Sequence, residues 1–169
     1  MLQLKHTKLE DVHRVMEIIE QAQLYFKEQG IDQWQNGYPN TNVIKNDIHK
    51  NHSYILTKDE MIVATAVISF EEEPTYREIF EGAWKSHQDY AVMHRVAVDP
   101  SFKGKGIASE IIRHTELMCK QNGVSSIKID THEDNHSMQR SLIKNGFEYC
   151  GVIYLTDGSK RVAFEKTLA

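Results

Sequence analysis

The stretch that decides the fold runs from Tyr90 to Ser109 and reads YAVMHRVAVDPSFKGKGIAS. The residues Tyr90–Val98 are rich in valine and alanine, with β-branched residues spaced as in a buried strand. Asp99 and Pro100 end this strand, because proline cannot donate to a strand ladder and turns the chain. Apolar residues at helical spacing begin directly after the glycine turn. The segment therefore predicts a strand, a tight turn and a helix in immediate succession.

The turn before this helix contains two glycines and two lysines. Glycine lets the backbone adopt positive φ and lets a ligand approach closely. Free N–H groups at a helix start converge on one point, where the helix dipole favours negative charge. Lys103 and Lys105 add positive side chains. The turn predicts an anion cradle suited to a pyrophosphate, and the alternative is a tight turn that needs small residues and has two solvated lysines.

Two well-known phosphate-binding motifs fail at this turn. A P-loop requires Gly-x-x-x-x-Gly-Lys-Ser/Thr, but Gly104-Lys105 is followed by Gly106, and Asp99 stands where the leading glycine should be. A dinucleotide fingerprint requires a third glycine where Ser109 stands, and this turn lies in the middle of the chain. A nucleotide-binding regulatory module is therefore the weaker alternative.

The rest of the chain predicts alternating strands and helices from its hydrophobic periodicity. Expected strands cover 2–6, Tyr54–Thr57, Met61–Phe70, Tyr90–Val98, Ser125–Thr131, Tyr149–Leu155 and Arg161–Lys166. Expected helices run from a Thr7–Glu10 capping box to Gly30, then over Val43–Lys50, Ile107–Asn122 and, capped by Asn135, His136–Asn145. A further helical turn is expected over Ile79–Trp84.

The long helix between strands 90–98 and 125–131 implies a parallel pair with a right-handed crossover. Hairpins elsewhere make the remaining sheet antiparallel. We therefore predict a mixed α/β (α+β) fold with a twisted, mixed sheet of six to seven strands, one central parallel strand pair and helices on both faces. Neither a linker nor a repeat interrupts the 169 residues, which predicts a single domain over 1–169.

Composition and charge indicate an ordinary globular protein. The chain is 40% hydrophobic and 26% charged, with a formal net charge of -4 that argues against nonspecific attraction to nucleic acid or membranes. We find neither the apolar run of a signal peptide nor a stretch of membrane-span length. The two cysteines, Cys119 and Cys150, lack metal-type spacing and are expected to be reduced thiols in a cytoplasmic protein.

The quoted stretch resembles the central signature of the GNAT N-acetyltransferase superfamily. That signature is Arg/Gln-x-x-Gly-x-Gly/Ala after a strand ending in Val-x-Val-Asp-Pro, and here Val96–Pro100 leads into Lys103–Ala108. Lys103 stands where Arg or Gln is usual, so the charge is kept but the bidentate geometry is lost. A second family segment, an Asn that opens a helix ending in Gly-Phe, is similar to Asn135 through Gly146-Phe147. The resemblance extends to the order of elements over nearly the whole chain.

The resemblance implies an acetyl-CoA-dependent enzyme that acetylates a primary amine of a small molecule or protein, and the family is often dimeric. Backbone groups of Val96 and Val98 would pair with the pantetheine arm like an added strand. Amides from Gly104 to Ser109 would hold the pyrophosphate, and Asn135 would lie near the cofactor. The expected cofactor-binding residues are Val96, Ala97, Val98, Lys103, Gly104, Lys105, Gly106, Ile107, Ala108, Ser109 and Asn135.

Acetyl transfer requires an amine that has lost its proton, which makes a general base useful. His94 is the leading candidate because it shares strand parity with Val96 and Val98. The alternative is a packed histidine that bonds a neighbouring strand. The family often uses a Tyr as general acid four residues before its Gly-Phe glycine, but Leu142 stands there. Tyr149 and Tyr154 are the substitute candidates, although both could be half-buried strand aromatics.

The missing tyrosine leaves two alternatives to acid catalysis by a side chain. One is direct attack of the amine, with solvent protonating the leaving thiolate. The other is a noncatalytic domain that senses acyl-CoA and keeps the cradle without turnover.

The acceptor region is less clearly marked. The segment Asp130–His136 follows the second parallel strand at the end where α/β sheets usually bind ligands. Its residue types suit a metal, but adjacent loop ligands rarely surround one ion and acetyl transfer requires none, so no metal is expected. We instead expect Asp134 or Asn135 to cap the next helix and the segment to face the substrate. Asp130, His132 or Glu133 could then hold a cationic substrate. The isolated aromatics expected to line the acceptor site, or else to anchor the core, are Trp34, Tyr38, Tyr76 and Trp84.

Overall fold

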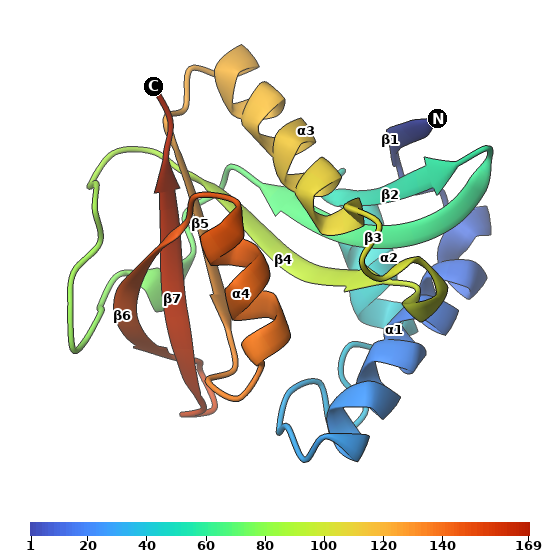
Figure 1. Ribbon diagram of the computed structural model, residues 1–169, viewed down its shortest axis with the longest axis horizontal. Helices are drawn as coiled ribbons and strands as arrows, with labels where there is room; N and C mark the ends of the chain where they lie inside the picture. The colour runs from blue at the N-terminus through green and yellow to red at the C-terminus, as the bar shows by residue number, and fades with distance from the viewer. The chain divides into compact units, whose positions relative to one another are not determined.

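The computed structural model describes all residues from Met1 to Ala169, and its elements follow the predicted order (Figure 1). They are β1 (Leu2–His6), α1 (Val12–Glu28), α2 (Thr41–His49), β2 (Ser53–Lys58), β3 (Met61–Ser69), β4 (Ala91–Val98), α3 (Ile107–Gln121), β5 (Ser126–Thr131), α4 (His136–Lys144), β6 (Glu148–Tyr154) and β7 (Lys160–Thr167). The strands form one 7-stranded sheet in the order β1-β2-β3-β4-β5-β7-β6. The pair β4–β5 is parallel, whereas β1–β2, β2–β3, β5–β7 and β6–β7 are antiparallel. The predicted mixed fold is thereby confirmed.

The chain forms two compact units. The first unit comprises Met1–Ile68 and His94–Ile111, and the second comprises Ser69–Met93 and Ile112–Ala169. Both β4 and α3 therefore contribute residues to each unit. The single domain expected over 1–169 stays a prediction.

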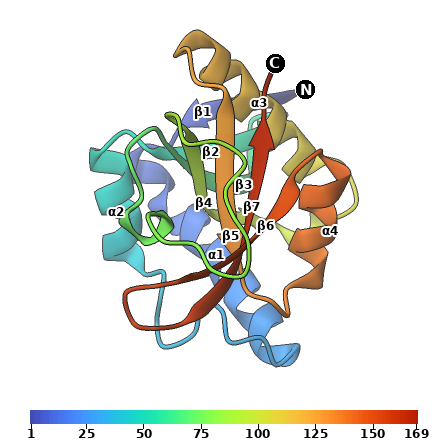
Figure 2. The same ribbon diagram turned by 90° about the vertical axis from the view of Figure 1, so that its left-hand side faces the viewer.

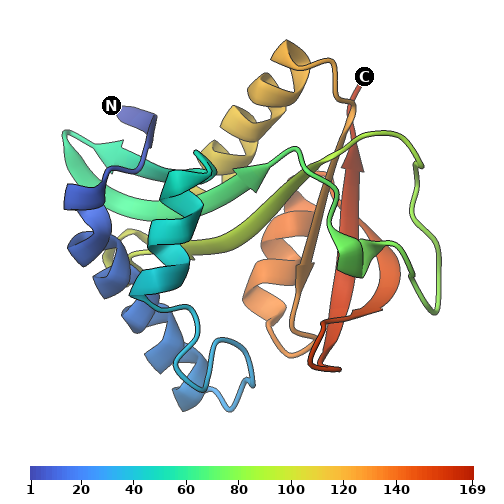
Figure 3. The same ribbon diagram turned by 180° about the vertical axis from the view of Figure 1, so that it is seen from behind.

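The core of the first unit lies where α1 and α2 pack against strands (Figure 3). The buried residues of this core are Val12, Val15, Ile18, Ile19, Ile44, Ile55 and Ala97. Those from α1 recur at three- and four-residue spacing, which places them on one face of the helix. An ion pair of 2.7 Å joins Arg14 of α1 to Asp99, directly after β4. Arg14 also donates to the Ile62 carbonyl, so α1 is attached to two strands by one side chain.

The second unit combines β5, β7, β6 and α4 with the long segment between β3 and β4. Figure 2 shows this segment passing over the strands of its own unit. Its aromatic residues enter a buried core made of Tyr76, Trp84, Val92, Cys150, Ile153 and Ala163. The backbone of Phe80 exchanges two hydrogen bonds of 2.8 Å with Val152, which attaches the segment to β6.

Two local expectations were wrong. The helix start does not use Thr7 and Glu10: a short 3-10 turn over Leu9–Asp11 precedes α1, and the Lys8 amide donates to the Asp11 carboxylate at 2.9 Å. Thr7 instead accepts a 2.8 Å bond from the Ser53 hydroxyl, because its backbone continues the pairing of β1 with β2. The expected helical turn over Ile79–Trp84 is likewise absent, because the Phe80 backbone pairs with β6.

The two cysteines are free and buried. Burial raises the pKa of Cys119 to about 11, and burial also raises the pKa of Cys150. No helix has the length and apolar character required to cross a bilayer.

Candidate functional site

The second half of β4 departs from regular strand geometry. The parallel ladder with β5 is limited to the pairs Ala91–Ile127 and Val92–Lys128, so Val96 and Val98 lie beyond it. Ala97 is buried in the core of the first unit, whereas Val96 and Val98 are half-buried. Arg95 adopts φ 47°, a left-handed conformation that is uncommon for a non-glycine residue. Such local breaks in a strand re-aim its backbone and often lie next to active sites.

The turn after β4 leaves open space above its glycines. Gly104 and Gly106 adopt φ values of 77° and 75°, which glycine takes without steric cost. A Cβ atom built on either residue would meet no protein atom within 4 Å. Packing therefore does not require glycine here, whereas the backbone conformation does, and the space beside it is available for a ligand.

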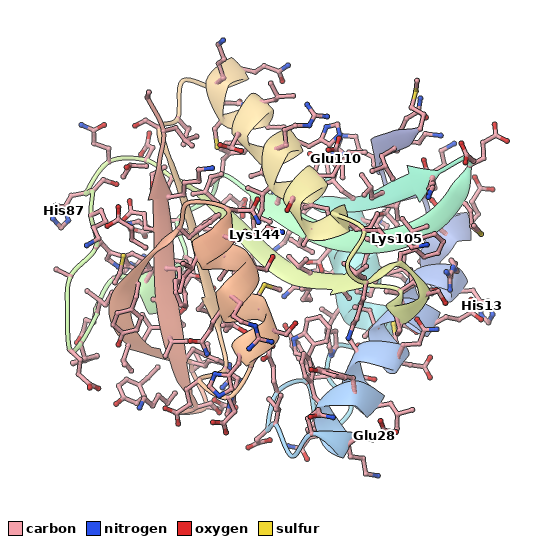
Figure 4. All side chains as sticks on the ribbon, viewed as in Figure 1. His13, Glu28, His87, Lys105, Glu110 and Lys144 are labelled. Atoms are coloured by element: carbon pink, nitrogen blue, oxygen red, sulfur yellow. The ribbon has the colours of Figure 1, made fainter.

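The start of α3 supplies backbone donors next to this turn. The Glu110 amide donates to the Gly106 carbonyl at 3.0 Å, which is the first turn of helical bonding. The geometry of a helix gives the amides of Ile107, Ala108 and Ser109 no acceptor within the helix itself. Figure 4 shows Lys105 on the turn that leads into the helix and Glu110 on the helix. A strand, two open glycines and helix-start amides thus follow one another within the first unit.

Lysines surround the turn but differ in what they contact. The Lys103 ammonium lies 3.9 Å from the centroid of the Tyr25 ring, within cation–π range, so Lys103 contacts α1. Lys105 and Lys58 lie 5.6 and 5.8 Å from the centroid of the Phe102 ring. Lys103 therefore differs from Lys105 in having an aromatic partner on α1.

His94 is half-buried at the start of the irregular segment. Burial above all, and then the nearby charges of Arg95 and His52, lower its pKa to about 3. The imidazole is therefore neutral at physiological pH, which is the protonation state a base requires. Its low pKa also makes it a weak proton acceptor, because general bases work best with a pKa near the working pH.

The aromatic residues expected in the α1–α2 connection occupy different environments. Trp34 packs edge-on against Phe26, with ring centroids 5.8 Å apart, at the border of the core. Tyr38 is 42% exposed, and its hydroxyl accepts a 2.8 Å hydrogen bond from the guanidinium of Arg95. The structure thus brings Tyr38, but not Trp34, into contact with the irregular segment of β4 through Arg95.

Arg95 and its partner Asp47 were not identified from the sequence. Arg95 donates from Nε at 2.8 Å and from Nη2 at 2.7 Å to the two carboxylate oxygens of Asp47 in α2. Asp47 is only 4% exposed. A signal was present, since Asp47 follows Ile44 at helical spacing and so places a carboxylate on the buried face of α2.

Three expected acceptor residues meet in a buried polar cluster of the second unit. The Tyr76 hydroxyl donates to the Asp130 carboxylate at 2.6 Å, and the rings of Tyr76 and Trp84 lie 5.1 Å apart. The Lys128 ammonium lies 4.4 and 4.3 Å from the centroids of the Trp84 and Tyr90 rings. Burial, and then the charge of Asp130, raises the pKa of Tyr76 well above its ordinary value. Burial also raises the pKa of Asp130, against the opposing effects of Tyr76 and Arg161.

The other expected residues of the second unit are held by local contacts. Asn135 is buried and caps α4 by accepting from the Met138 amide at 3.2 Å. His132 accepts from the Asp134 amide at 3.0 Å. Tyr149 and Tyr154 are 48% and 44% exposed and pack edge-on against Phe164 and Phe80. No three His, Cys, Asp or Glu side chains are grouped so that they could hold a metal ion.

Comparison with known proteins identifies the family to which this fold and glycine turn belong. The sequence model of the Acetyltransferase (GNAT) family matches residues 15–147. The chain therefore belongs to the GNAT acetyltransferase family, as its resemblance predicts.

Individual relatives agree with this assignment. The uncharacterized N-acetyltransferase YesJ of Bacillus subtilis (strain 168) is 22% identical over 94% of this chain and 86% of its own. A GNAT-family acetyltransferase from Streptococcus agalactiae 2603 is 31% identical with a TM-score of 0.90, over 99% and 96% of the two chains. The PaiA N-acetyltransferase of Thermoplasma acidophilum, solved with coenzyme A, has a TM-score of 0.70 at 18% identity, over 99% of each chain.

Proposed function

We propose that this protein is an acetyl-CoA-dependent N-acetyltransferase that acetylates a primary amine of a small molecule or protein. The observation that carries the proposal is the open turn at Gly104 and Gly106, which joins the irregular strand segment to helix-start amides. Family membership supports the same reaction class. The relative solved with coenzyme A shares the fold and is consistent with the proposed cofactor.

Acetyl-CoA would supply an activated acetyl thioester, and the chain's backbone would hold it. Beyond the ladder with β5, the backbone groups of Val96 and Val98 are suited to pairing with the amides of pantetheine. The amides of Ile107, Ala108 and Ser109 would bind the pyrophosphate, since a helix start favours negative charge. Lys105 would add a positive charge beside them. These contacts would orient the acetyl group without any metal ion.

His94 is the proposed general base, and its pKa gives that role a testable signature. A primary ammonium must lose its proton before the nitrogen can attack, and a neutral imidazole can accept it directly or through water. A base with a pKa of about 3 is deprotonated at every pH above that value. We therefore expect no loss of kcat/KM between pH 8 and the ordinary histidine value of about 6.5 beyond that caused by protonation of the amine itself.

The His94→Ala variant completes this test. Turnover should fall by about 10²-fold, the low end of the range for a general base because the low pKa makes the imidazole a weak proton acceptor, whereas coenzyme A affinity should change little. The measurement is a pH–rate profile for both proteins with one amine. An acidic limb near pH 6.5 that disappears in the variant would contradict a buried, low-pKa His94, and an unchanged rate would remove His94 from the mechanism.

One observation favours a second candidate, a noncatalytic acyl-CoA sensor. Leu142, at the position of the family's tyrosine, is 1% exposed and belongs to the core rather than to a reactive surface. Cytoplasmic location and dimerisation, like the roles of Tyr149 and Tyr154, stay predictions.

The decisive experiment has two stages. Thermal unfolding with acetyl-CoA, coenzyme A, ATP and NAD tests the cofactor, and we expect a rise in Tm with the two coenzyme A species alone. Release of free thiol across a panel of amines then tests the reaction. No stabilisation by either coenzyme A species would refute both candidates, whereas stabilisation without thiol release would favour the sensor.

A further inference from the structure

The strained residue of β4 is held from one side by an ion pair. Arg95 keeps its left-handed φ of 47° while two of its nitrogens bind both oxygens of Asp47. Arginine binds a carboxylate in this two-pronged way because its donors form a planar fork, which lysine cannot reproduce. With side chains 18% and 6% exposed, the pair is largely removed from water. The fork therefore fixes the orientation of the guanidinium and the direction of its remaining donors.

One of those remaining donors determines how the Tyr38 hydroxyl can bond. Arg95 Nη1 donates to this oxygen at 2.8 Å, so the hydroxyl acts as an acceptor toward the protein. A tyrosine hydroxyl has one proton of its own to donate. Because Arg95 occupies the oxygen with a cationic donor, that proton is directed elsewhere, and bonds in such a chain strengthen one another. Tyr38 is 42% exposed, so a ligand can reach its side chain.

The segment that carries Tyr38 is itself held in place. Gln23 of α1 donates to the carbonyls of Tyr38 and Pro39 at 2.9 and 3.1 Å. The next residue, Asn40, caps α2 by accepting from the Val43 amide at 3.0 Å. The hydroxyl thus projects from a fixed backbone, which is the arrangement that selective recognition requires.

We propose that Arg95 is a positioning residue that presents the Tyr38 hydroxyl as a hydrogen-bond donor to the acceptor. The acceptor class it fits is an amine that also carries a carbonyl or carboxylate oxygen, such as an amino-acid derivative or peptide, rather than a plain alkylamine. The proposal rests on the acetyltransferase function proposed above, and it adds a specificity determinant to it.

The test compares two acceptors in several variants. The probes are an amine from the panel with a carbonyl or carboxylate oxygen, such as glycinamide, and ethylamine, which lacks that oxygen. Tyr38→Phe removes only an exposed hydroxyl, and Arg95→Lys keeps the charge but loses the fork. Each should reduce the wild-type preference for the oxygen-bearing amine, expressed as a ratio of kcat/KM values, by about tenfold. Because the ratio is compared between proteins, differences in amine basicity cancel.

Two further measurements separate positioning from general packing. The double variant should lose no more preference than either single variant, since the two residues act through one hydrogen bond. Arg14→Lys is the control, because it perturbs another Arg–Asp pair of 2.7 Å in the same unit and removes the guanidinium that bonds the Ile62 carbonyl, so it should lower Tm while leaving the preference within about twofold. Coenzyme A affinity should also stay within about twofold in Tyr38→Phe.

Each outcome decides a separate question. An unchanged preference in Tyr38→Phe, an equal loss in Arg14→Lys, or a wild-type preference for ethylamine would overturn the positioning role. Absence of thiol release from the wild-type protein with every amine would instead refute the proposed function.

Discussion

The glycine turn of the first unit and the buried Glu165 carboxylate of the second unit use polar groups in opposite ways. Around Gly104 and Gly106 the polar groups are backbone amides and exposed lysines, and the space beside the glycines is open. In the second unit Glu165 is 1% exposed and its carboxylate accepts from Lys85, Ser86 and Ser126. The polar groups that we propose to hold a ligand are left open, whereas those of Glu165 and its donors are enclosed by partners. This difference predicts where a substitution will change binding and where it will change stability.

The largest effect should come from placing a carboxylate in the turn. Gly106→Asp adds negative charge where a pyrophosphate would bind, and we expect coenzyme A binding to weaken by at least about 1,000-fold, or about 4 kcal/mol. Titration calorimetry measures this change. Gly158→Asp is the matched control, because Gly158 also has positive φ and open space but lies in the β6–β7 turn. Equal affinity in the two variants would refute the placement of the pyrophosphate.

A substitution at the enclosed Glu165 carboxylate should lower stability and leave coenzyme A binding nearly unchanged. Glu165→Gln replaces one acceptor oxygen with an NH₂ group. That group is itself a donor, and it would face the donors that the carboxylate accepts from. We expect the free energy of unfolding to fall by about 3 kcal/mol, with coenzyme A affinity changed by less than about threefold. Glu116→Gln, at a partly buried pair with Lys166, should cost about 1 kcal/mol or less. Denaturant unfolding measures the stability of both variants. A loss of less than about 1 kcal/mol in Glu165→Gln would contradict the view that this carboxylate serves the fold.

The burial of Asp130 should make stability depend on pH, and its bond with Tyr76 should reduce that dependence. Burial raises the folded-state pKa of Asp130 above its ordinary 3.8, so between these two pKa values the folded state binds more protons and stability falls as pH rises. Tyr76→Phe removes the donor that opposes this shift. The variant should lose about 2 kcal/mol at pH 7 and less below pH 4, where the carboxyl is protonated.

Unfolding of both proteins across this pH range provides the measurement. Tyr149→Phe, which alters an exposed ring, should change stability by less than about 0.5 kcal/mol at either pH. A Tyr76→Phe loss that does not depend on pH would show that Asp130 does not titrate as described.

The smallest expected change is in coenzyme A affinity when either lysine of the turn is replaced. Lys103 contacts the Tyr25 ring at 3.9 Å, so we expect Lys103→Ala to weaken coenzyme A binding by less than about threefold. Lys105→Ala should weaken it by about three- to tenfold, with a smaller dependence on salt than the wild type. Titrations at two ionic strengths test this order, and a larger effect at Lys103 would reverse it.

The order of helices and strands was predictable because hydrophobic periodicity is a local property of the chain. The glycine turn was predictable for the same reason, since its strand end, glycines and helix start occupy one contiguous stretch. The start of α1 was not, because the hydroxyl of Thr7 accepts from Ser53, which is 46 residues away. Local capping preference cannot reveal a competing partner of that kind.

Side-chain contacts between distant residues were harder to predict than the backbone of the glycine turn. Arg95 and Asp47 are 48 residues apart, and Tyr76 and Asp130 are 54 apart. Nothing in the flanking residues of an isolated arginine states whether it will be solvated or paired with a buried acid. The fold decides whether an arginine is paired, because it brings the partner close. The same partners raise or lower the pKa values of the groups that they contact.

The buried cysteines have a practical consequence for enzymology. The thiolate is the form that attacks electrophiles, and a pKa of about 11 at Cys119 leaves roughly one molecule in ten thousand ionised at neutral pH. Cys150 is shielded in the same manner. A colorimetric disulfide reagent should therefore find little to react with on the native protein. In the proposed thiol-release assay, the colour would therefore report coenzyme A set free, with hardly any background from the protein's own cysteines.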